Sequence, residues 1–130
     1  EGEDPARFVR VDGDLAAAVV HEALVEADAV SPGNVAVIVP RDLAEPTAEA
    51  FAEAGVEVGR ATRSGLEAGI TLVPVDLVKG LELDAALVVE PAAIVESGPK
   101  GLKALYVALT RATHRLTVVH ARDLPPSLRE

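Results

Sequence analysis

Two short stretches of the chain combine residue types that could act on a phosphate group or a nucleotide. The first, Val78 to Asp84, contains Lys79, Gly80 and Glu82. A lysine offers a cation, a glycine lets a phosphate or sugar approach the backbone closely, and a carboxylate can accept hydrogen bonds from a ribose hydroxyl or from a metal-bound water. A polar turn between two buried strands, with a solvated charge pair, is the simpler interpretation of the same residues.

The second stretch is a predicted helix from Gly101 to about Ala112. Its buried stripe repeats at helical spacing, and Arg111 ends a partly basic face at the carboxyl end of the helix. An arginine at this position can simply complement the helix dipole. It could also reach a neighbouring domain as an arginine finger, which stabilises charge on a transferring phosphoryl group. The buried stripe consists of Leu102, Leu105, Leu109 and Ala112.

Other kinds of catalytic or binding site are not supported by the residue pattern. The chain has no cysteine, and His21, His114 and His120 are not spaced as metal ligands, so no metal site is predicted. No G-x-x-x-x-G-K-[ST] run occurs, and the lysine-glycine pair Lys79-Gly80 is in the wrong order for a P-loop. We therefore expect that this domain cannot bind and cleave a nucleotide by itself.

The elements that must position these residues follow from the apolar pattern. Short apolar, β-branched runs alternate with helical stretches, which predicts an α/β fold with a mainly parallel sheet of five to six strands and helices on both faces. Ligands in such sheets bind at the carboxyl ends of the strands. We expect three loops to gather there, at 40–42, at 76–84 and around Arg111. The predicted strands are 8–11, 35–39, 56–58, 70–75, 85–89 and 116–120, with a loop over 59–69, a connector over 91–99 and core residues Val37, Val39, Leu72, Val88, Leu109 and Val118.

The remaining two helices are predicted before and after the strand at 35–39. Asp14 is a good N-cap for a helix to about Asp28, and Gly55 is placed to end the second helix. The start of the second helix is ambiguous between a capping box of Asp42 and Glu45 and a first helical residue at Pro46. In the first helix, the pattern predicts an apolar face of Leu15, Ala16, Val19, Val20, Ala23 and Leu24, with His21, Glu22 and Glu26 facing water.

Length and composition predict one domain spanning residues 1–130, and we expect residues 1–6 and 125–130 to be frayed. Hydrophobic residues make up 49% of the chain and charged residues 25%, as in a globular protein. No apolar run is long enough for a membrane span and no signal peptide precedes the first strand, so a cytoplasmic protein is expected. The net charge of -9 argues against a free-standing nucleic-acid binder, although one wall of a larger cleft can be acidic.

Taken together, these motifs resemble those of the C-terminal RecA-like (2A) domain of UvrD/Rep-type superfamily 1 helicases. The run V-K-G-L-E-L-D from Val78 resembles helicase motif V, A-K-G-L-E-F-D, and L-Y-V-A-L-T-R-A from Leu105 resembles motif VI, Y-V-A-L-T-R-A. The strand from Asn34 and the helix after it are similar to the motif IV region. The likeness covers almost the whole chain, and it implies a RecA-like, P-loop NTPase-type sheet that lacks its own P-loop.

The resemblance also implies a role for each matching residue. Arg111 is then the catalytic arginine that reaches the γ-phosphate of ATP, and Glu82 and Gly80 lie near the nucleotide. Lys79 and Thr110 couple the nucleotide state to the nucleic-acid groove. ATP with Mg²⁺ would be bound mainly by an N-terminal RecA-like domain of the same protein, so the parent is expected to be an ATP hydrolase that acts on DNA, and the 130-residue domain alone is expected to be inactive.

Three departures separate this chain from the DNA-unwinding members. If Arg41 is the first motif IV arginine, Thr47 stands where the second is expected; Asp76 replaces a histidine; and a short loop replaces the large insertion between Val58 and Ile70. The P-x-x-x-x-K-G-L-E element from Pro74 to Glu82, the missing insertion and the ending from Arg115 to His120 together resemble the HelD-like branch. The alternative function is therefore a docking module that binds a protein partner such as RNA polymerase, with little or no unwinding.

Overall fold

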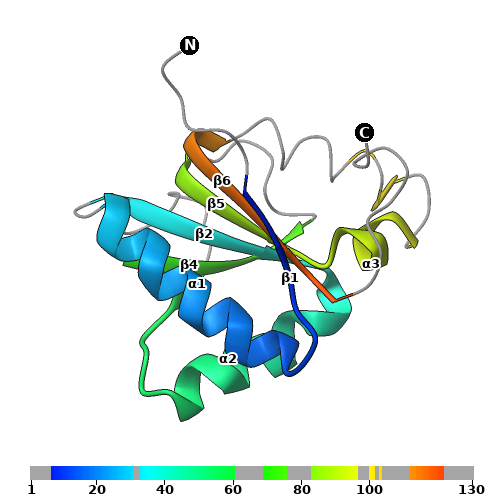
Figure 1. The fold of residues 1–130 in the computed structure, drawn as a ribbon, viewed down its shortest axis with the longest axis horizontal. Helices are drawn as coiled ribbons and strands as arrows, with labels where there is room; N and C mark the ends of the chain where they lie inside the picture. Colours follow the sequence, from blue (N-terminus) through cyan, green and yellow to red (C-terminus); the bar gives the residue numbers. More distant parts are fainter. Residues whose placement is uncertain are drawn as a thin grey trace.

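A six-stranded, wholly parallel sheet forms the centre of the domain (Figure 1). The computed structural model describes residues 7–30, 33–60, 69–75, 83–96, 100–101, 103 and 112–121. The strand order is β1-β6-β5-β2-β4-β3, which confirms the predicted α/β class and the strand number. The strands are β1 (Arg7–Arg10), β2 (Asn34–Val39), β3 (Gly59–Arg60), β4 (Gly69–Pro74), β5 (Leu83–Val89) and β6 (Ala112–His120).

Both faces of the central strands are buried, as expected for continuous apolar strands. Alternate residues of β2, β4 and β5 pack with helices α1 (Leu15–Val30) and α2 (Ala44–Glu53), which lie on one face of the sheet (Figure 1). The residues between them, such as Ile38 and Val88, face the other way and are equally buried. The predicted core residues Val37, Val39, Leu72, Val88 and Val118 are all buried, whereas Leu109 lies outside the described residues.

The start of α1 is set by a side-chain cap. The Asp14 carboxylate accepts a hydrogen bond from the Ala17 backbone N–H at 3.2 Å, and its carbonyl accepts one from Ala18. Asp14 therefore satisfies an amide that the first turn of a helix leaves without a partner, as the sequence predicted.

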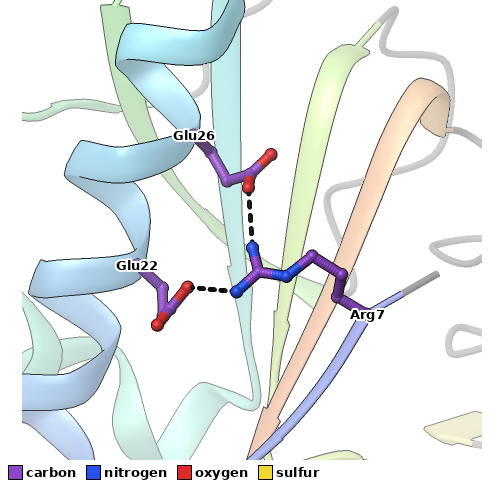
Figure 2. A network of polar contacts seen from close by, with 3 residues as sticks. All are labelled: Arg7, Glu22 and Glu26. Carbon is purple, nitrogen blue, oxygen red and sulfur yellow. Dashed lines mark hydrogen bonds and ion pairs between the residues drawn. The ribbon is translucent and has the colours of Figure 1, made fainter. Parts of the chain in front are cut away.

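The face that α1 turns to the sheet differs from the predicted one. Leu24 is 45% exposed, whereas Glu26 is only 1% exposed. Figure 2 shows the reason: the Arg7 guanidinium on β1 forms 3.0 Å ion pairs with Glu22 and Glu26. Because β1 brings a cation to the inner side of α1, both carboxylates turn inward. The prediction that Glu22 and Glu26 face water was wrong, and His21 is exposed as predicted.

The second helix begins in neither of the two predicted ways. A short 3-10 turn, η1 (Arg41–Leu43), leads directly into α2, and the N-cap Leu43 makes no side-chain capping bond. Pro46 is the third residue of the helix, within the first turn, where an amide has no intrahelical acceptor and proline costs little.

The end of α2 is a Schellman motif, as the glycine predicted. Gly55 has φ +75°, its N–H donates to the Ala52 carbonyl at 3.1 Å, and the Val56 N–H donates to Phe51 at 2.9 Å. Both bonds satisfy carbonyl groups that the last turn would otherwise leave open.

The two faces of α2 differ sharply in chemistry. Phe51 is fully buried and Thr47 is 3% exposed, so these residues contact the core. On the opposite face, Glu45, Glu49 and Glu53 are spaced four residues apart and are exposed. The outer face of α2 is therefore strongly acidic.

Three predicted elements were wrong in the part of the chain that the structure describes. The edge strand is Gly59–Arg60, not 56–58, and it pairs with Thr71 and Leu72 of β4. The predicted connector after β5 contains helix α3 (Pro91–Glu96), whose first residue is a proline, the position a helix tolerates best. Ala112 is the first residue of β6 and not the end of a helix, although Lys100, Gly101 and Lys103 are helical.

No helix in the described ranges has the length and apolarity that crossing a membrane requires.

Candidate functional site at the amino edge of the sheet

The residues that the sequence singled out for chemistry all fall outside the described part of the chain. Lys79, Gly80 and Glu82 lie in the gap between β4 and β5, and Thr110 and Arg111 lie just before β6. Their positions relative to one another are not described. Leu83, which directly follows Glu82, and Ala112, which directly follows Arg111, are described. The point at which the chain leaves each segment is therefore known.

The strands that follow Glu82 and Arg111 begin side by side. Leu83 is the first residue of β5 and Ala112 the first of β6, and the two are partners in the parallel ladder. Both lie at the amino edge of the sheet, which is the edge where all strands begin. The sequence had placed the loops around 76–84 and Arg111 at the opposite, carboxyl edge. That expectation was wrong for the entries into β5 and β6, because strands in a parallel ladder begin at one edge and end at the other.

A register shift occurs directly after this pair. Leu83 is opposite Ala112, but Ala85 is opposite Arg115, so β6 contains one residue more than β5 over this interval. Such a β-bulge bends its strand locally and is common beside active sites. The Leu83–Ala112 pair is therefore separated by this irregularity from the regular ladder that follows.

On its other side, the start of β5 is tied to β2 by two side chains. The Asp84 carboxylate accepts a hydrogen bond from the Asn34 backbone N–H at 2.8 Å, and the Asn34 side-chain oxygen accepts one from the Asp84 N–H at 2.9 Å. The regular β2–β5 pairing starts one residue later, at Val35 and Ala85. The two side chains thus extend the pairing of the strands to the edge of the sheet. We call this reciprocal arrangement the Asn34–Asp84 clasp.

Gly33 leaves room for this clasp. A Cβ atom on Gly33 would overlap the Asp84 carboxylate, with Asp84 Cγ at 2.8 Å, and would lie 2.9 Å from the Val30 carbonyl oxygen. The Gly33 N–H donates to that same carbonyl at 2.6 Å, and the Gly33 carbonyl accepts from Gly69 N–H at 3.4 Å. The end of α1 and the starts of β4, β2 and β5 therefore meet around one glycine.

The carboxyl edge of the sheet contains a different set of polar groups. Glu90 follows β5 with φ 50°, a conformation that non-glycine residues rarely adopt, and it is 4% exposed. One of its carboxylate oxygens accepts from the Ala121 N–H at 3.0 Å, and its own N–H donates to Val119 at 2.8 Å. Arg41 also follows a strand at this edge, after β2, and is exposed. These contacts close the ends of β5 and β6 against each other.

The segment expected from the sequence to resemble motif IV carries one cation and one buried hydroxyl. Arg41 lies at the carboxyl edge, whereas Thr47, at the place of the expected second arginine, packs into the core with 3% exposure. An arginine at position 47 would have to bury its charge, so this position of α2 is structural. Within the described ranges, no group of three or more histidine, aspartate or glutamate side chains is arranged to hold a metal ion.

The clasp was only partly visible in the sequence. Asp84 is the last residue of the Val78–Asp84 segment that the sequence singled out, but Asn34 was not connected with it. Each residue directly precedes a continuous apolar run, Val35–Val39 or Ala85–Val89, and that shared position was the available signal. Glu90, at the end of one of these runs, was missed.

Comparison with known proteins gives one informative kind of match. Neither a protein-family profile nor a curated protein matches this chain. Among solved structures, the C-terminal domain of a possible DNA helicase from Lactobacillus plantarum WCFS1 is 27% identical, with a TM-score of 0.76 over 98% of this chain and 80% of that one. Over nearly its whole length, the chain is thus similar in fold and sequence to the C-terminal domain of a possible DNA helicase.

Proposed function

We propose that this chain is the C-terminal motor domain of an ATP-dependent DNA helicase or translocase. In this role it supplies motif V and the motif VI arginine, Arg111, to ATP bound by an N-terminal RecA-like domain of the same protein. The observation that carries the proposal is the fold similarity to a helicase C-terminal domain over 98% of the chain. The two motif-like segments in the sequence support it independently.

Under this proposal, two domains share the ATP site, because this chain has only some of the residues that such a site requires. The chain has no P-loop, and its described part has no acidic cluster for a metal ion, so its residues do not fit a complete Mg²⁺–ATP site. ATP with Mg²⁺, held by the other domain, would supply the phosphoryl group and the metal. Residues of this chain would act when the two domains close: Arg111 would place its guanidinium against the γ-phosphate, and Glu82 and Gly80 would approach the ribose and phosphates.

The starts of β5 and β6 suit such a role. Leu83 and Ala112 are ladder partners, so the chain reaches the same edge of the sheet directly after Glu82 and directly after Arg111. Two side chains of one domain that act on the same nucleotide must reach it from the same side of that domain. Lys79 and Thr110, from the same two segments, would couple closure on ATP to movement of the bound DNA strand.

The test uses the full-length protein that contains this chain and measures DNA-stimulated ATP hydrolysis. Arg111→Ala should lower turnover by about a hundredfold or more, because it removes transition-state stabilisation. Arg111→Lys should not restore it, because an ammonium group cannot make the planar two-pronged contact of arginine with phosphate oxygens. Arg7→Ala, on β1, is the matched control for loss of an arginine and should retain turnover.

The isolated 130-residue domain should hydrolyse no ATP. Turnover by this fragment above that of an empty-vector preparation would contradict the proposal, and so would normal turnover by full-length Arg111→Ala. A large drop in the melting temperature of Arg111→Ala, without a specific loss of turnover, would make Arg111 a structural cap instead.

A second candidate function is a docking module for a protein partner, in the manner of the HelD-like branch and RNA polymerase. The acidic outer face of α2, with Glu45, Glu49 and Glu53 exposed, favours a basic protein over a phosphate backbone. The burial of Thr47, at the expected place of a phosphate-binding arginine, points the same way. Reversing the three glutamates to lysine should abolish partner binding under this function and leave DNA-stimulated ATP hydrolysis unchanged.

A further inference from the structure

We propose that Asn34 and Asp84 are positioning residues for the ATP half-site, and this inference rests on the proposed function. Neither residue needs to touch the nucleotide. Their clasp fixes the start of β5, and the start of β5 in turn fixes the start of β6. The two strands directly follow Glu82 and Arg111 in the chain.

The first step of the argument is that the clasp anchors the start of β5 to the most buried part of the sheet. Residues 35–39 of β2 are all fully buried, so β2 is a rigid reference. Asn34 and Asp84 each donate a backbone N–H to the other's side-chain oxygen, at 2.8 and 2.9 Å. Two bonds between the same two residues fix both the separation and the rotation of the strand ends, whereas a single bond would leave rotation free.

The second step carries this restraint to β6. Leu83 is covalently next to Asp84 and is the ladder partner of Ala112. The bulge that follows separates this pair from the regular ladder, which resumes at Ala85 and Arg115. The first residue of β6 therefore has Leu83 as its ladder partner ahead of the regular pairing of the two strands. Loss of the clasp should free both strand starts together.

The third step is the space that the protein keeps for the clasp. Gly33 has no side chain where a Cβ atom would overlap the Asp84 carboxylate. A simple turn after α1 would accept other residues, because Gly33 is not in the left-handed region that favours glycine. The missing Cβ is explained by the carboxylate that occupies its place.

The geometry predicts which substitutions the clasp tolerates. Only a short side chain with an oxygen acceptor is required at each position, so Asp84→Asn and the exchange Asn34→Asp with Asp84→Asn preserve both bonds. Asp84→Ala removes the acceptor of the Asn34 N–H and leaves only the bond from the residue 84 N–H to the Asn34 side-chain oxygen, which does not restrain rotation of the strand ends. If Asp84 acted directly on the nucleotide or its metal through its charge, Asp84→Asn would be as harmful as Asp84→Ala.

The experiment measures kcat and KM for ATP in the full-length protein. Asp84→Ala should lower kcat by about ten- to a hundredfold, because small displacements of catalytic groups have effects of this size. Its KM for ATP should stay within about threefold of wild type, since the N-terminal domain would supply most nucleotide contacts. Asp84→Asn and the exchanged pair should keep kcat within about threefold of wild type. Arg7→Ala is the control for loss of stability alone, and its kcat should be unchanged.

Hydrogen exchange in the same full-length variants provides a second readout. Asp84→Ala should increase exchange at the amides of 83–85 and also at 112–115, but not at 7–10 of β1. Unchanged exchange at 112–115 would overturn the inference, because the restraint would then not reach β6.

The kinetic outcomes separate this inference from the proposed function. If Arg111→Ala abolishes turnover and Asp84→Ala retains it, the proposed function stands and the positioning role is wrong. If Asp84→Asn loses as much kcat as Asp84→Ala, the residue acts through its charge and the clasp explanation is wrong. If wild-type protein hydrolyses no ATP, both proposals are overturned.

Discussion

Replacing Gly33 with alanine perturbs the clasp through a single added methyl group. The new Cβ would lie 2.8 Å from Asp84 Cγ and 2.9 Å from the Val30 carbonyl oxygen, both closer than non-bonded atoms approach. The carboxylate can rotate away only by giving up its 2.8 Å bond to the Asn34 N–H. The Val30 carbonyl is less free to move, because it belongs to the backbone at the end of α1.

The loss of stability expected for Gly33→Ala follows from these two contacts. Loss of one partly buried hydrogen bond costs about 1 kcal/mol, and forcing a methyl group against a fixed backbone costs about 1–3 kcal/mol. Lower entropy of the unfolded chain offsets roughly 0.5–1 kcal/mol of this sum. The net loss in the free energy of unfolding should be about 2 kcal/mol, or about 8 °C in melting temperature for a domain of this size.

The assay is thermal and urea unfolding of Gly33→Ala beside Gly13→Ala, whose added Cβ would meet no atom within 4 Å. Gly33→Ala should also be measured in the Asp84→Ala background, where the carboxylate is gone. There its cost should fall by about 1 kcal/mol or more, as expected for residues in direct contact. Equal melting temperatures for Gly33→Ala and Gly13→Ala, or an unchanged cost when Asp84 is absent, would refute the reasoning.

Two further predictions concern the packing of the helices against the sheet. Phe51→Ala should lower the free energy of unfolding by about 3–5 kcal/mol, because Phe51 is fully buried and its loss leaves a cavity under α2; a loss below about 1 kcal/mol in urea unfolding would show that the core closes over the gap. Arg7→Ala should lower the free energy of unfolding by about 1 kcal/mol. This loss lies between those expected for a surface ion pair and for a buried one, because the Arg7 side chain is 44% exposed while the Glu26 side chain is 1% exposed. Glu22→Ala should cost less than Arg7→Ala, and the reverse order in thermal melts would contradict the assigned ion pairs.

The buried central strands, the start of α1 and the end of α2 could be predicted because their signals are local. Val35–Val39 is apolar at every position, so its burial on both faces required no knowledge of its neighbours. Asp14 and Gly55 were recognised as the first and last signals of helices, and each makes the backbone contacts that such signals imply.

The predictions were wrong or incomplete where the position of a side chain depends on a residue far away in the sequence. Glu26 is polar on a helix surface and would face water if Arg7 did not approach from β1. Asn34 and Asp84 are unremarkable in the sequence, and only the pairing of β2 with β5 brings them together. The carboxyl edge was expected for the chain leading into β5 and β6, whereas the described strand starts, Leu83 and Ala112, lie at the amino edge, because a general rule about parallel sheets was applied without the direction of each connection. The roles of Glu82 and Arg111 themselves stay predictions.

The position of β1 also has a consequence for how the domain folds. In the described sheet, β1 lies at one end and pairs with β6, so that Arg7 is opposite Thr117 and Arg10 is opposite His120. During synthesis, β1 emerges long before its ladder partner, and its hydrogen bonds with β6 must wait until the last strand has been made. Closing so long a loop is entropically unfavourable and is compensated only when the whole sheet forms. We therefore expect slow, late docking of β1 onto β6, with the Arg7 pairs to Glu22 and Glu26 holding β1 against α1 in the meantime.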